Sequence, residues 1–490
     1  MQHTRRGSVF GLLASLLVMV LGLGAAGPAT GFGSGLPAHV HPGVLQQTLG
    51  HPGATLRVIV MKAAGAEGVE AAAIAAGGRV TGSWPMINAF GVELEASGLA
   101  ALSRIPGVRA VLADHPVSST KVGKGQGHSE PALPYVMAVK AHNMWNEGFT
   151  GAGVTVAVVD TGIYSDPASP TDFGNRVLAN VAVNEAATTS TDEYGHGTHV
   201  AAIVGGNGLH SGGAYSGIAP GVNLVNVKID DGTGSASERD LLTGLQWVYD
   251  HRAEYNIRVV NISSTVTTAV SYLESPTAAA VEQLWMNGVV VVVAAGNQGS
   301  DPCAVCRPPA NDPFVIAVGA VDDNGTSVLS DDFMKEWSSR GTTQDGFAKP
   351  DLVAPGAQII SYMPVGALRQ AAPGNIVDTH YFRMGGTSMS APVVSGVVAL
   401  LLQARPDLTP NQVKWLLQTT ARGYRDRPPE TPGIVNAMSA AEYKQPVGSA
   451  NQGIAPSTLL DPSDGTIDYS NVLWGNVLWG NVLWGNSPDY

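Results

Sequence analysis

The chain has 490 residues, more than one domain of ordinary size needs, so we expect two or three folded units. Hydrophobic residues at 44% suffice for a large core, and charged residues at 13% are few. The net charge of −12 argues against a nucleic-acid-binding protein, because such binding surfaces are basic.

The first thirty residues have the layout of an export signal. Arg5 and Arg6 precede an apolar run over 9–23, and small residues follow over 24–27. A basic start, a short apolar stretch and a small-residue exit are typical of a secretory signal peptide. A membrane anchor is the alternative, but the run is shorter than the ~20 residues that a spanning helix needs. We predict a signal peptide over 1–30 and a secreted, extracellular or cell-surface-associated protein.

Residues 31–130 predict a small α+β unit followed by a linker. The hydrophobic period changes repeatedly between Thr55 and Asp114, in the order strand, helix, strand, strand, helix, strand. This βαββαβ order is that of a ferredoxin-like unit, and an unrelated small α+β domain is the alternative. Residues 121–130 are polar and glycine-rich, as a processing linker should be. The strands are expected over 56–62, 79–83, 88–94 and 108–113, and the helices over 65–76 and 96–105.

Residues 131–445 alternate between short β-branched runs and longer helical stretches. Near-continuous apolar runs are expected of parallel strands that are buried on both faces. The pattern predicts a doubly wound α/β domain with a mostly parallel sheet, whose ligands lie beyond the carboxyl ends of the strands. We expect strands over 155–160, 223–228, 258–262, 289–294 and 314–318, with helices over 237–255, 276–286 and 388–404.

The last segment, residues 446–490, is a polar tail that ends in a repeat. Asn-Val-Leu-Trp-Gly occurs three times from Asn471 to Gly485, so the tryptophans are five residues apart. Neither a regular strand nor a regular helix would place them on one face. Exposed tryptophans favour binding, so we predict an accessory tail that contacts the cell surface or another protein.

Three segments stand out together: Asp160-Thr161-Gly162, His196-Gly197-Thr198-His199 and Gly386-Thr387-Ser388-Met389-Ser390-Ala391-Pro392. In these motifs the chain resembles the subtilisin family of serine proteases. The order Asp, His, Ser along the chain is that of the family. The resemblance covers roughly residues 134–421, and the α+β unit before them resembles the family's inhibitory propeptide.

The resemblance implies a subtilisin-like fold and a secreted serine endopeptidase made as a zymogen. Its partners would be polypeptide substrates and its own propeptide, which would assist folding, act as an intramolecular inhibitor and then be cut off in the linker. A secreted binding or scaffold protein that keeps the fold without turnover is the alternative. It would be favoured by a missing catalytic residue, and none is missing.

The same three segments can be argued from their chemistry. A serine hydroxyl such as that of Ser388 needs a neighbouring base to take its proton. His196 can act as that base, because an imidazole is largely neutral at pH 7. Asp160 would fix the tautomer of His196 and stabilise the imidazolium. An Asp-Thr-Gly alone is most often just a turn, so the joint pattern carries the argument.

The oxyanion of such a reaction would be bound by two donors. Ser388 precedes an apolar run and should open a helix, whose first backbone N–H groups suit a developing negative charge. Asn297 follows an apolar strand, and the resemblance assigns its side-chain amide to the same oxyanion. Asn297 as a simple turn former is the alternative.

Substrate binding is where the sequence departs from the family pattern. The family has Ser-Leu-Gly along its substrate edge, whereas this chain has Ser263, Ser264 and Thr265. We expect an extended peptide to pair with this edge by β-augmentation. Thr265 cannot match the close approach that glycine permits. Because Ala294, Ala295 and Gly296 are small, we expect an open first-site pocket that accepts large apolar residues.

Neither a metal ion nor the two cysteines are expected to take part directly in catalysis. His196 and His199 lack a matching ligand set for a metal site, and His199 is expected to be structural. Cys303 and Cys306 predict a local disulfide in an exported protein, with a redox pair as the alternative. The reaction itself requires no cofactor. Structural Ca²⁺ is common in the family, but the loop over 205–217 has few carboxylates, so no calcium site is assigned.

Overall fold

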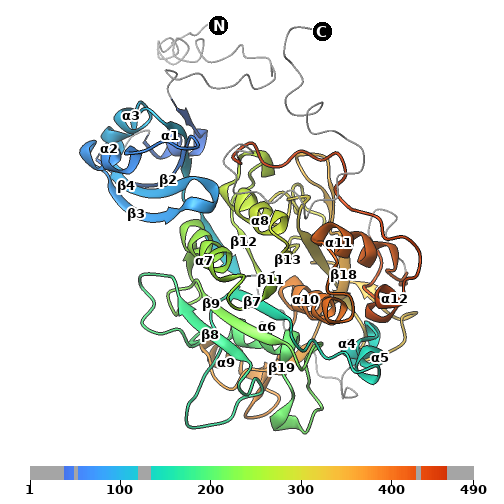
Figure 1. Cartoon of the computed structure of the whole chain (residues 1–490). Helices are drawn as coiled ribbons and strands as arrows, with labels where there is room; N and C mark the ends of the chain where they lie inside the picture. The colour runs from blue at the N-terminus through green and yellow to red at the C-terminus, as the bar shows by residue number, and fades with distance from the viewer. Residues whose placement is uncertain (1–37, 49–52, 120–133, 426, 428–431, 461–490) are drawn as a thin grey trace, which may run out of the picture.

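The computed structural model describes residues 38–48, 53–119, 134–425, 427 and 432–460 (Figure 1). The predicted signal peptide, the whole of the linker predicted over 121–130 and the tryptophan repeats lie outside these residues.

The N-terminal unit, residues 38–119, contains a five-stranded sheet in the order β1-β5-β2-β4-β3. All neighbouring strands are antiparallel except β1 and β5, which are parallel. The strands expected between 56 and 113 are present. The strands are β1 (His39–Val40), β2 (Thr55–Lys62), β3 (Arg79–Trp84), β4 (Ala89–Glu95) and β5 (Val108–Ala113), and the helices are α1 (Pro42–Thr48), α2 (Val69–Ala75) and α3 (Leu99–Leu102).

Both predicted helices of this unit are shorter than expected. α2 begins at Val69 rather than near Gly65, because Gly65 and Gly68 both have positive φ, which ends any helical path there. The stretch expected as one helix over 96–105 is a 3₁₀ turn over Ala96–Gly98 followed by the four residues of α3. β1 and α1 were not predicted.

The two faces of the N-terminal sheet have different neighbours. Val58 and Val60 on β2 point into the unit's own core, where they pack with residues of α2 and α3. The alternate residues Ile59 and Met61 belong to the apolar core of the following unit. Because side chains alternate along a strand, one sheet serves two cores.

The large unit is built on a sheet whose main path runs β15-β14-β13-β11-β7-β9-β8, with β18 pairing to β14. All of its pairs are parallel except β14 with β15. The doubly wound, mostly parallel sheet expected from the sequence is therefore confirmed. Its strands are β7 (Thr155–Asp160), β8 (Val177–Ala182), β9 (Asn223–Lys228), β11 (Ile257–Ile262), β13 (Val290–Ala294), β14 (Ile316–Asp322), β15 (Phe333–Met334) and β18 (Leu352–Pro355).

Two helix pairs cover the two faces of this sheet (Figure 1). α6 (His196–Gly205) packs with α10 (Thr387–Ala404), and α7 (Glu238–His251) packs with α8 (Pro276–Met286). α7 starts one residue later than predicted because Ser237 caps it in a capping box with Asp240. α10 alone among the described helices is long and apolar enough to span a membrane, but it is a buried core helix.

Two peripheral features bear on function. The short strand β6 (Pro116–Ser119) follows the N-terminal sheet and lies between β10 (Ala236–Ser237) and β12 (Ser264–Val266) of the large unit. The segment after residue 445, expected to be a separate tail, continues to pack on the large unit as far as Leu460. The residues directly after the expected boundary at 445 are therefore part of the packed large unit.

Candidate active site

Asp160 and His196 are brought together at the carboxyl end of the central sheet. Asp160 is the last residue of β7, and His196 is the first residue of α6. The His196 Nδ1 and Asp160 Oδ1 atoms are 2.7 Å apart, and both side chains are almost fully buried. Asp160 Oδ1 also accepts from Thr161 N at 2.8 Å. The arrangement leaves Nε2 as the nitrogen that can take a proton.

A close backbone approach requires glycine beside this pair. A Cβ placed on Gly197 would lie 2.3 Å from the carbonyl oxygen of Gly162. Gly197 N instead donates to Thr161 Oγ1 at 2.8 Å. The glycine in His-Gly-Thr-His thus lets α6 contact the Asp-Thr-Gly turn directly.

A residue that the sequence analysis did not single out, Asp192, connects the same two segments. Its carboxylate accepts from Gly195 N at 2.7 Å and from Thr198 N and Oγ1 at 2.8 and 2.7 Å. It also accepts from Thr161 Oγ1 at 3.0 Å. No helix was predicted at His196, and Asp192 is not the N-cap of α6, so the sequence offered no signal for this role.

The ionisation of His196 is set by opposing effects. Burial disfavours the imidazolium, but the adjoining Asp160 carboxylate, with Asp192 and Asp230 farther away, outweighs burial and raises the pKa of His196 above its usual value. His199, one helical turn later, is different. Burial lowers its pKa to about 3, and its Nε2 lies 3.0 Å from Phe382 O, so His199 is a neutral structural residue as expected.

Ser388 lies at the second position of α10 and is fully buried. Its hydroxyl donates to Ser263 O at 2.9 Å, and the Ser263 hydroxyl donates back to Ser388 O at 2.9 Å. Pro392 explains why this carbonyl is available. It lies four residues along the helix and has no N–H to donate to Ser388 O.

The Ser388 hydroxyl thus donates to the backbone directly before β12. His196 Nε2 has no hydrogen-bond partner within the described ranges. Proton transfer requires a hydrogen bond from the Ser388 hydroxyl to this nitrogen, and catalytic hydrogen bonds commonly tighten only when substrate binds.

Asn297 is oriented by the first residue of α10. Its Oδ1 accepts from Thr387 N and from Thr387 Oγ1, each at 3.0 Å. Because the oxygen is held in this way, the donor end of the amide is left for another acceptor. The sequence-predicted Asn297 and Ser388 therefore meet at the start of one helix.

The substrate edge predicted at Ser263, Ser264 and Thr265 is occupied by the chain itself. β6 pairs antiparallel with β12, with Ser118 opposite Thr265 and Ser119 opposite Ser264. On its other side β6 pairs with β10. The ladder forms although position 265 carries a threonine, so the absence of glycine does not prevent a peptide from pairing here.

The residues expected to line a first-site pocket surround the end of β13. Ala294 and Ala295 are buried, and Gly296 has a φ of 106° that favours glycine. A Cβ on Gly296 would lie 2.9 Å from Ser339 Oγ. The small side chains are needed for the backbone to follow this path, and the size of residue that they admit stays a prediction.

Cys303 and Cys306 form a disulfide in the loop after Asn297, with a Cα–Cα distance of 4.9 Å. The predicted local staple is thus present. The same loop supports the substrate edge, because Pro308 O accepts from Val266 N at 2.9 Å.

The carboxylate next to the loop over 205–217 does not suit a calcium ion. Asp172 is fully buried, and its two oxygens lie 2.8 Å from His210 Nδ1 and 2.8 Å from Tyr381 Oη. Both carboxylate oxygens are therefore engaged by protein groups. Within the described ranges no cluster of three or more His, Cys, Asp or Glu side chains could hold a metal ion.

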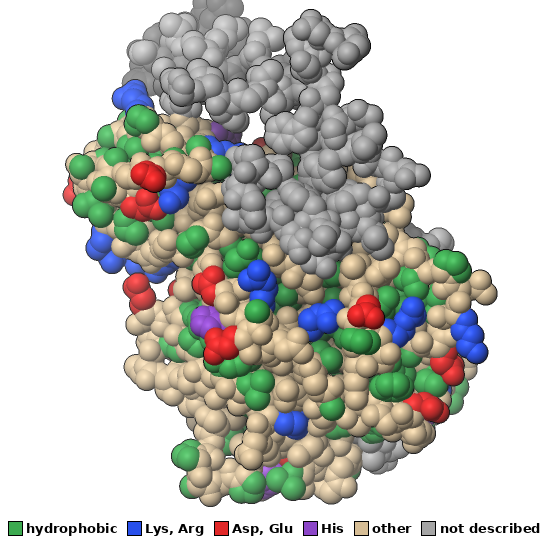
Figure 2. Space-filling model, in the orientation of Figure 1, with side chains coloured by type: hydrophobic (Ala, Val, Ile, Leu, Met, Phe, Trp, Pro, Cys, Tyr) green, Lys and Arg blue, Asp and Glu red, His purple; other side chains and the backbone are tan. Residues whose placement is uncertain are grey.

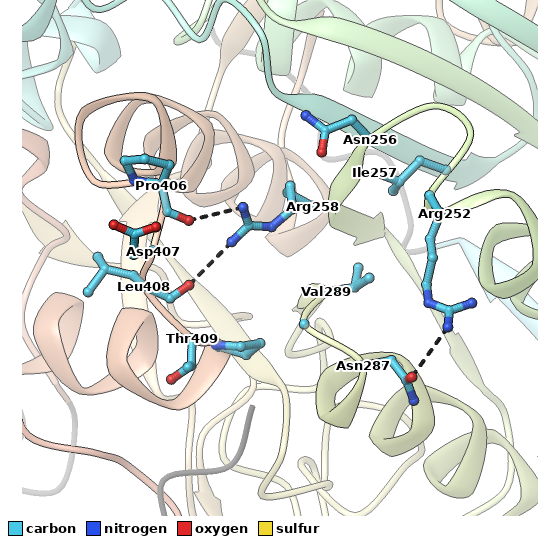
Figure 3. Close-up of a pocket in the computed structure, with 13 residues that line it drawn as sticks. Arg252, Asn256, Ile257, Arg258, Asn287, Val289, Pro406, Asp407, Leu408 and Thr409 are labelled. Carbon is cyan, nitrogen blue, oxygen red and sulfur yellow. Dashed lines mark hydrogen bonds between the residues drawn. The ribbon is translucent and has the colours of Figure 1, made fainter. Parts of the chain in front are cut away.

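A cavity of 420 Å³ lies at the opposite end of the sheet from these residues. It is lined by Arg252 and Arg258 near the start of β11, whereas Ser263 follows the end of that strand. Figure 3 shows the Arg258 guanidinium turned to the carbonyls of Pro406 and Leu408, at 3.1 and 3.3 Å. This cavity is separate from the candidate active site.

Comparisons with known proteins find related sequences over most of the large unit. Residues 151–451 match the Subtilase family. The chain is 40% identical over 299 residues to serine protease AprX of Bacillus subtilis, an alignment that covers 59% of this chain and 66% of AprX. It is 31% identical to subtilisin DY of Bacillus licheniformis, covering 63% of this chain and 99% of that protein.

A solved structure has a fold similar to that of this chain. Fervidolysin from Fervidobacterium pennivorans, described as a keratinolytic enzyme related to subtilisin, matches with a TM-score of 0.63 and 25% identity. The match covers 86% of this chain and 65% of fervidolysin. The chain thus spans about two thirds of the length of AprX and of fervidolysin.

Proposed function

The chain belongs to the subtilase family, and from this premise we propose that it is a serine endopeptidase made as an inhibited precursor. The observation that carries the proposal is the convergence of the Asp160–His196 pair and Ser388 at one end of the central sheet, beside an edge strand that pairs with an extended peptide segment. A cofactor is not required, because protein groups supply every proton transfer in this chemistry.

In the first step, the Ser388 hydroxyl attacks the carbonyl carbon of the scissile peptide bond. His196 Nε2 takes the serine proton, and Asp160 stabilises the imidazolium through its contact with Nδ1. The peptide C–N bond then breaks as His196 returns the proton to the leaving amine. Water, activated by the same histidine, hydrolyses the acyl-enzyme and regenerates the serine.

Two donors are available for the oxyanion of each tetrahedral intermediate. One is a backbone N–H at the start of α10, where the helix dipole is positive. The other is the amide NH₂ of Asn297, which the two hydrogen bonds from Thr387 orient. Fixed donors of this kind stabilise charge that develops in the transition state more than they stabilise the bound substrate.

The N-terminal unit is proposed as the inhibitor. β6 lies in the position that β-augmentation predicts for a substrate, paired on both sides. The unit itself is docked on α7 and α8, with Trp84 Nε1 donating to Thr243 Oγ1 at 3.1 Å and Met86 N to Gln246 Oε1 at 3.1 Å. Asp114 accepts from Arg239 N in the first turn of α7. A substrate cannot pair with β12 until β6 leaves.

The substrates are proposed to be polypeptides in an extended conformation, outside the cell. Figure 2 shows acidic and basic side chains interspersed over the face it displays, without a continuous basic stripe. Val117 is the buried side chain of β6, between the exposed Pro116 and Ser118. We therefore expect substrates to prefer an aliphatic residue at the position that Val117 occupies.

The test is hydrolysis of casein and of a peptide library by the purified protein, beside Ser388→Ala and Ser390→Ala variants. Ser390 is the matched control, because it is a buried serine two residues along the same helix. The proposal predicts that Ser388→Ala lowers kcat by roughly 10⁶-fold and that Ser390→Ala stays within tenfold of the parent. An inert but folded and fully processed parent would support a non-catalytic scaffold instead.

A further inference from the structure

We propose that the segment Ser457–Leu460, the C-terminal clamp, holds the N-terminal unit against the catalytic unit. It deepens the proposed function, because the unit held in place is the proposed inhibitor. The clamp lies about 350 residues along the chain from the strand that it contacts, beyond residue 451, where the family match ends. Figure 1 shows the C-terminal segment running across the large unit toward the N-terminal unit.

The clamp is anchored to the catalytic unit by its own backbone and hydroxyls. Ser457 N donates to Oε2 of the buried Glu282 on α8 at 2.7 Å. Thr458 N and Thr458 Oγ1 both donate to Leu273 O, at 3.0 and 2.6 Å. These bonds fix the direction in which the carbonyls of the clamp point.

Those carbonyls face an arginine of the N-terminal unit. Arg109 lies on β5, and its Nη2 donates to Thr458 O at 3.0 Å while Nη1 lies 3.5 Å from Leu459 O. A guanidinium presents several donors in a rigid fork, so two neighbouring carbonyls on a fixed backbone are a suitable partner. Neither carbonyl belongs to the catalytic cleft, so this contact can fail without any change in the reacting groups.

Apolar burial adds to the contact. Leu459 and Leu460, the last two residues that the structure describes, are only 9% and 7% exposed. They belong to the same apolar cluster as Ala110 and Leu112 on β5. The clamp is therefore held in the apolar core of the large unit, to which the inner face of the N-terminal sheet also belongs.

The consequence is that the C-terminal extension controls how long the inhibitor stays bound. A chain that ends before Ser457 would retain the catalytic groups but would lose the carbonyls that Arg109 binds. A chain that ends after Leu460 would keep them. Removal of the tail at different points should thus have different effects on activation.

The first experiment measures the clamp without any proteolysis. Hydrogen exchange is recorded on the full chain carrying Ser388→Ala, with and without Arg109→Met. The proposal predicts that exchange over 455–460 rises about fivefold with Arg109→Met, the effect of losing a charged hydrogen-bond donor. Arg104→Met is the matched control, an exposed arginine of the same unit, and should change nothing. Unchanged exchange in Arg109→Met would overturn the proposal.

The second experiment measures the delay before the full-length protein hydrolyses a peptide. Arg109→Met, and a chain ending at residue 456, should shorten the delay about fivefold and reach the parent's final turnover. Arg104→Met and a chain ending at residue 460 should keep the parent's delay. Equal delays for Arg109→Met and Arg104→Met would contradict the clamp. A parent that never becomes active would contradict the proposed protease while leaving the exchange result to decide on the clamp.

Discussion

The two main sheets of this protein differ in what covers them. The central sheet has helices of its own unit on both faces, α6 with α10 and α7 with α8. The N-terminal sheet has its own helices on one face only, and the side chains of the other face belong to the core of the large unit. The central sheet is therefore self-sufficient, whereas the N-terminal sheet depends on the large unit for the apolar burial of one of its two faces.

This difference separates two kinds of property. The proposed reacting groups lie at the carboxyl end of the self-sufficient sheet and on two of its helices, α6 and α10, so their substitution should change turnover. The shared face positions β6 on the substrate edge, so its substitution should change when turnover begins. The following predictions use this distinction, starting from the largest expected effect.

Asn297→Ala should lower kcat about 10²- to 10³-fold with little change in KM, because the lost amide acts mainly on the transition state. Steady-state kinetics on the activated enzyme test this, with Gln298→Ala as the neighbouring control. A change confined to KM would assign Asn297 to substrate binding instead.

Ile59→Asp should weaken docking of the N-terminal unit by about 3–5 kcal/mol, since it places an unpaired charge on the shared face. Native mass spectrometry should find the cleaved unit released rather than bound, and the final kcat of the activated enzyme should match the parent. Leu45→Asp is the control, because Leu45 is an exposed apolar residue of the same unit. Equal retention of the cleaved unit in the two variants would contradict the conclusion that this face of the N-terminal sheet shares a core with the large unit.

Asp192→Asn should lower kcat about tenfold and shift the acid limb of the pH profile to lower pH. The negative charge of Asp192 helps to raise the pKa of His196, and its hydrogen bonds fix the start of α6. The parent requires neutral His196, so its activity should fall as pH drops through a midpoint above 6.5. A lower kcat with an unmoved midpoint would leave Asp192 only a structural role.

Release of the N-terminal unit should become faster as pH rises from 6 to 8. Burial, together with the charge of Asp114, raises the pKa of Glu238 to about 7 in the covered state. If release of the N-terminal unit returns that pKa toward 4.5, the protein with the unit bound binds more protons than the protein after release. The bound state therefore loses stability as pH rises through 7. Glu238→Gln should flatten the dependence several-fold. If the release rate had the same pH slope in the parent and in the variant, the Glu238 carboxyl would be excluded as the cause of the pH dependence.

The sequence was sufficient to predict the elements whose pattern is local. The β-branched runs became buried parallel strands, and the serine motif opened a helix because apolar residues follow it. The central α/β architecture was therefore predictable. The order of the three motifs along the chain supplied the candidate residues.

Features that depend on distant partners could not be predicted in this way. The side chains of β2 alternate between two faces of the sheet, and both faces are apolar. The sequence does not reveal that α7 and α8 cover one of these faces. Residues 447–460 are polar and irregular, yet they pack because buried groups such as Glu282 accept from their backbone. No pattern of apolar residues marks Asp192 in the sequence either. Its role depends on the backbone N–H groups at the start of α6, which donate to its carboxylate.

The most direct test of the account follows two quantities in one sample of the full-length parent. Peptide hydrolysis and native mass are recorded at intervals as the chain matures. The account predicts that activity rises in step with loss of the bound N-terminal unit, and that molecules whose linker is cut while the unit is still bound stay inactive. Full activity in molecules that still carry the bound unit would contradict the claim that β6 blocks the substrate edge.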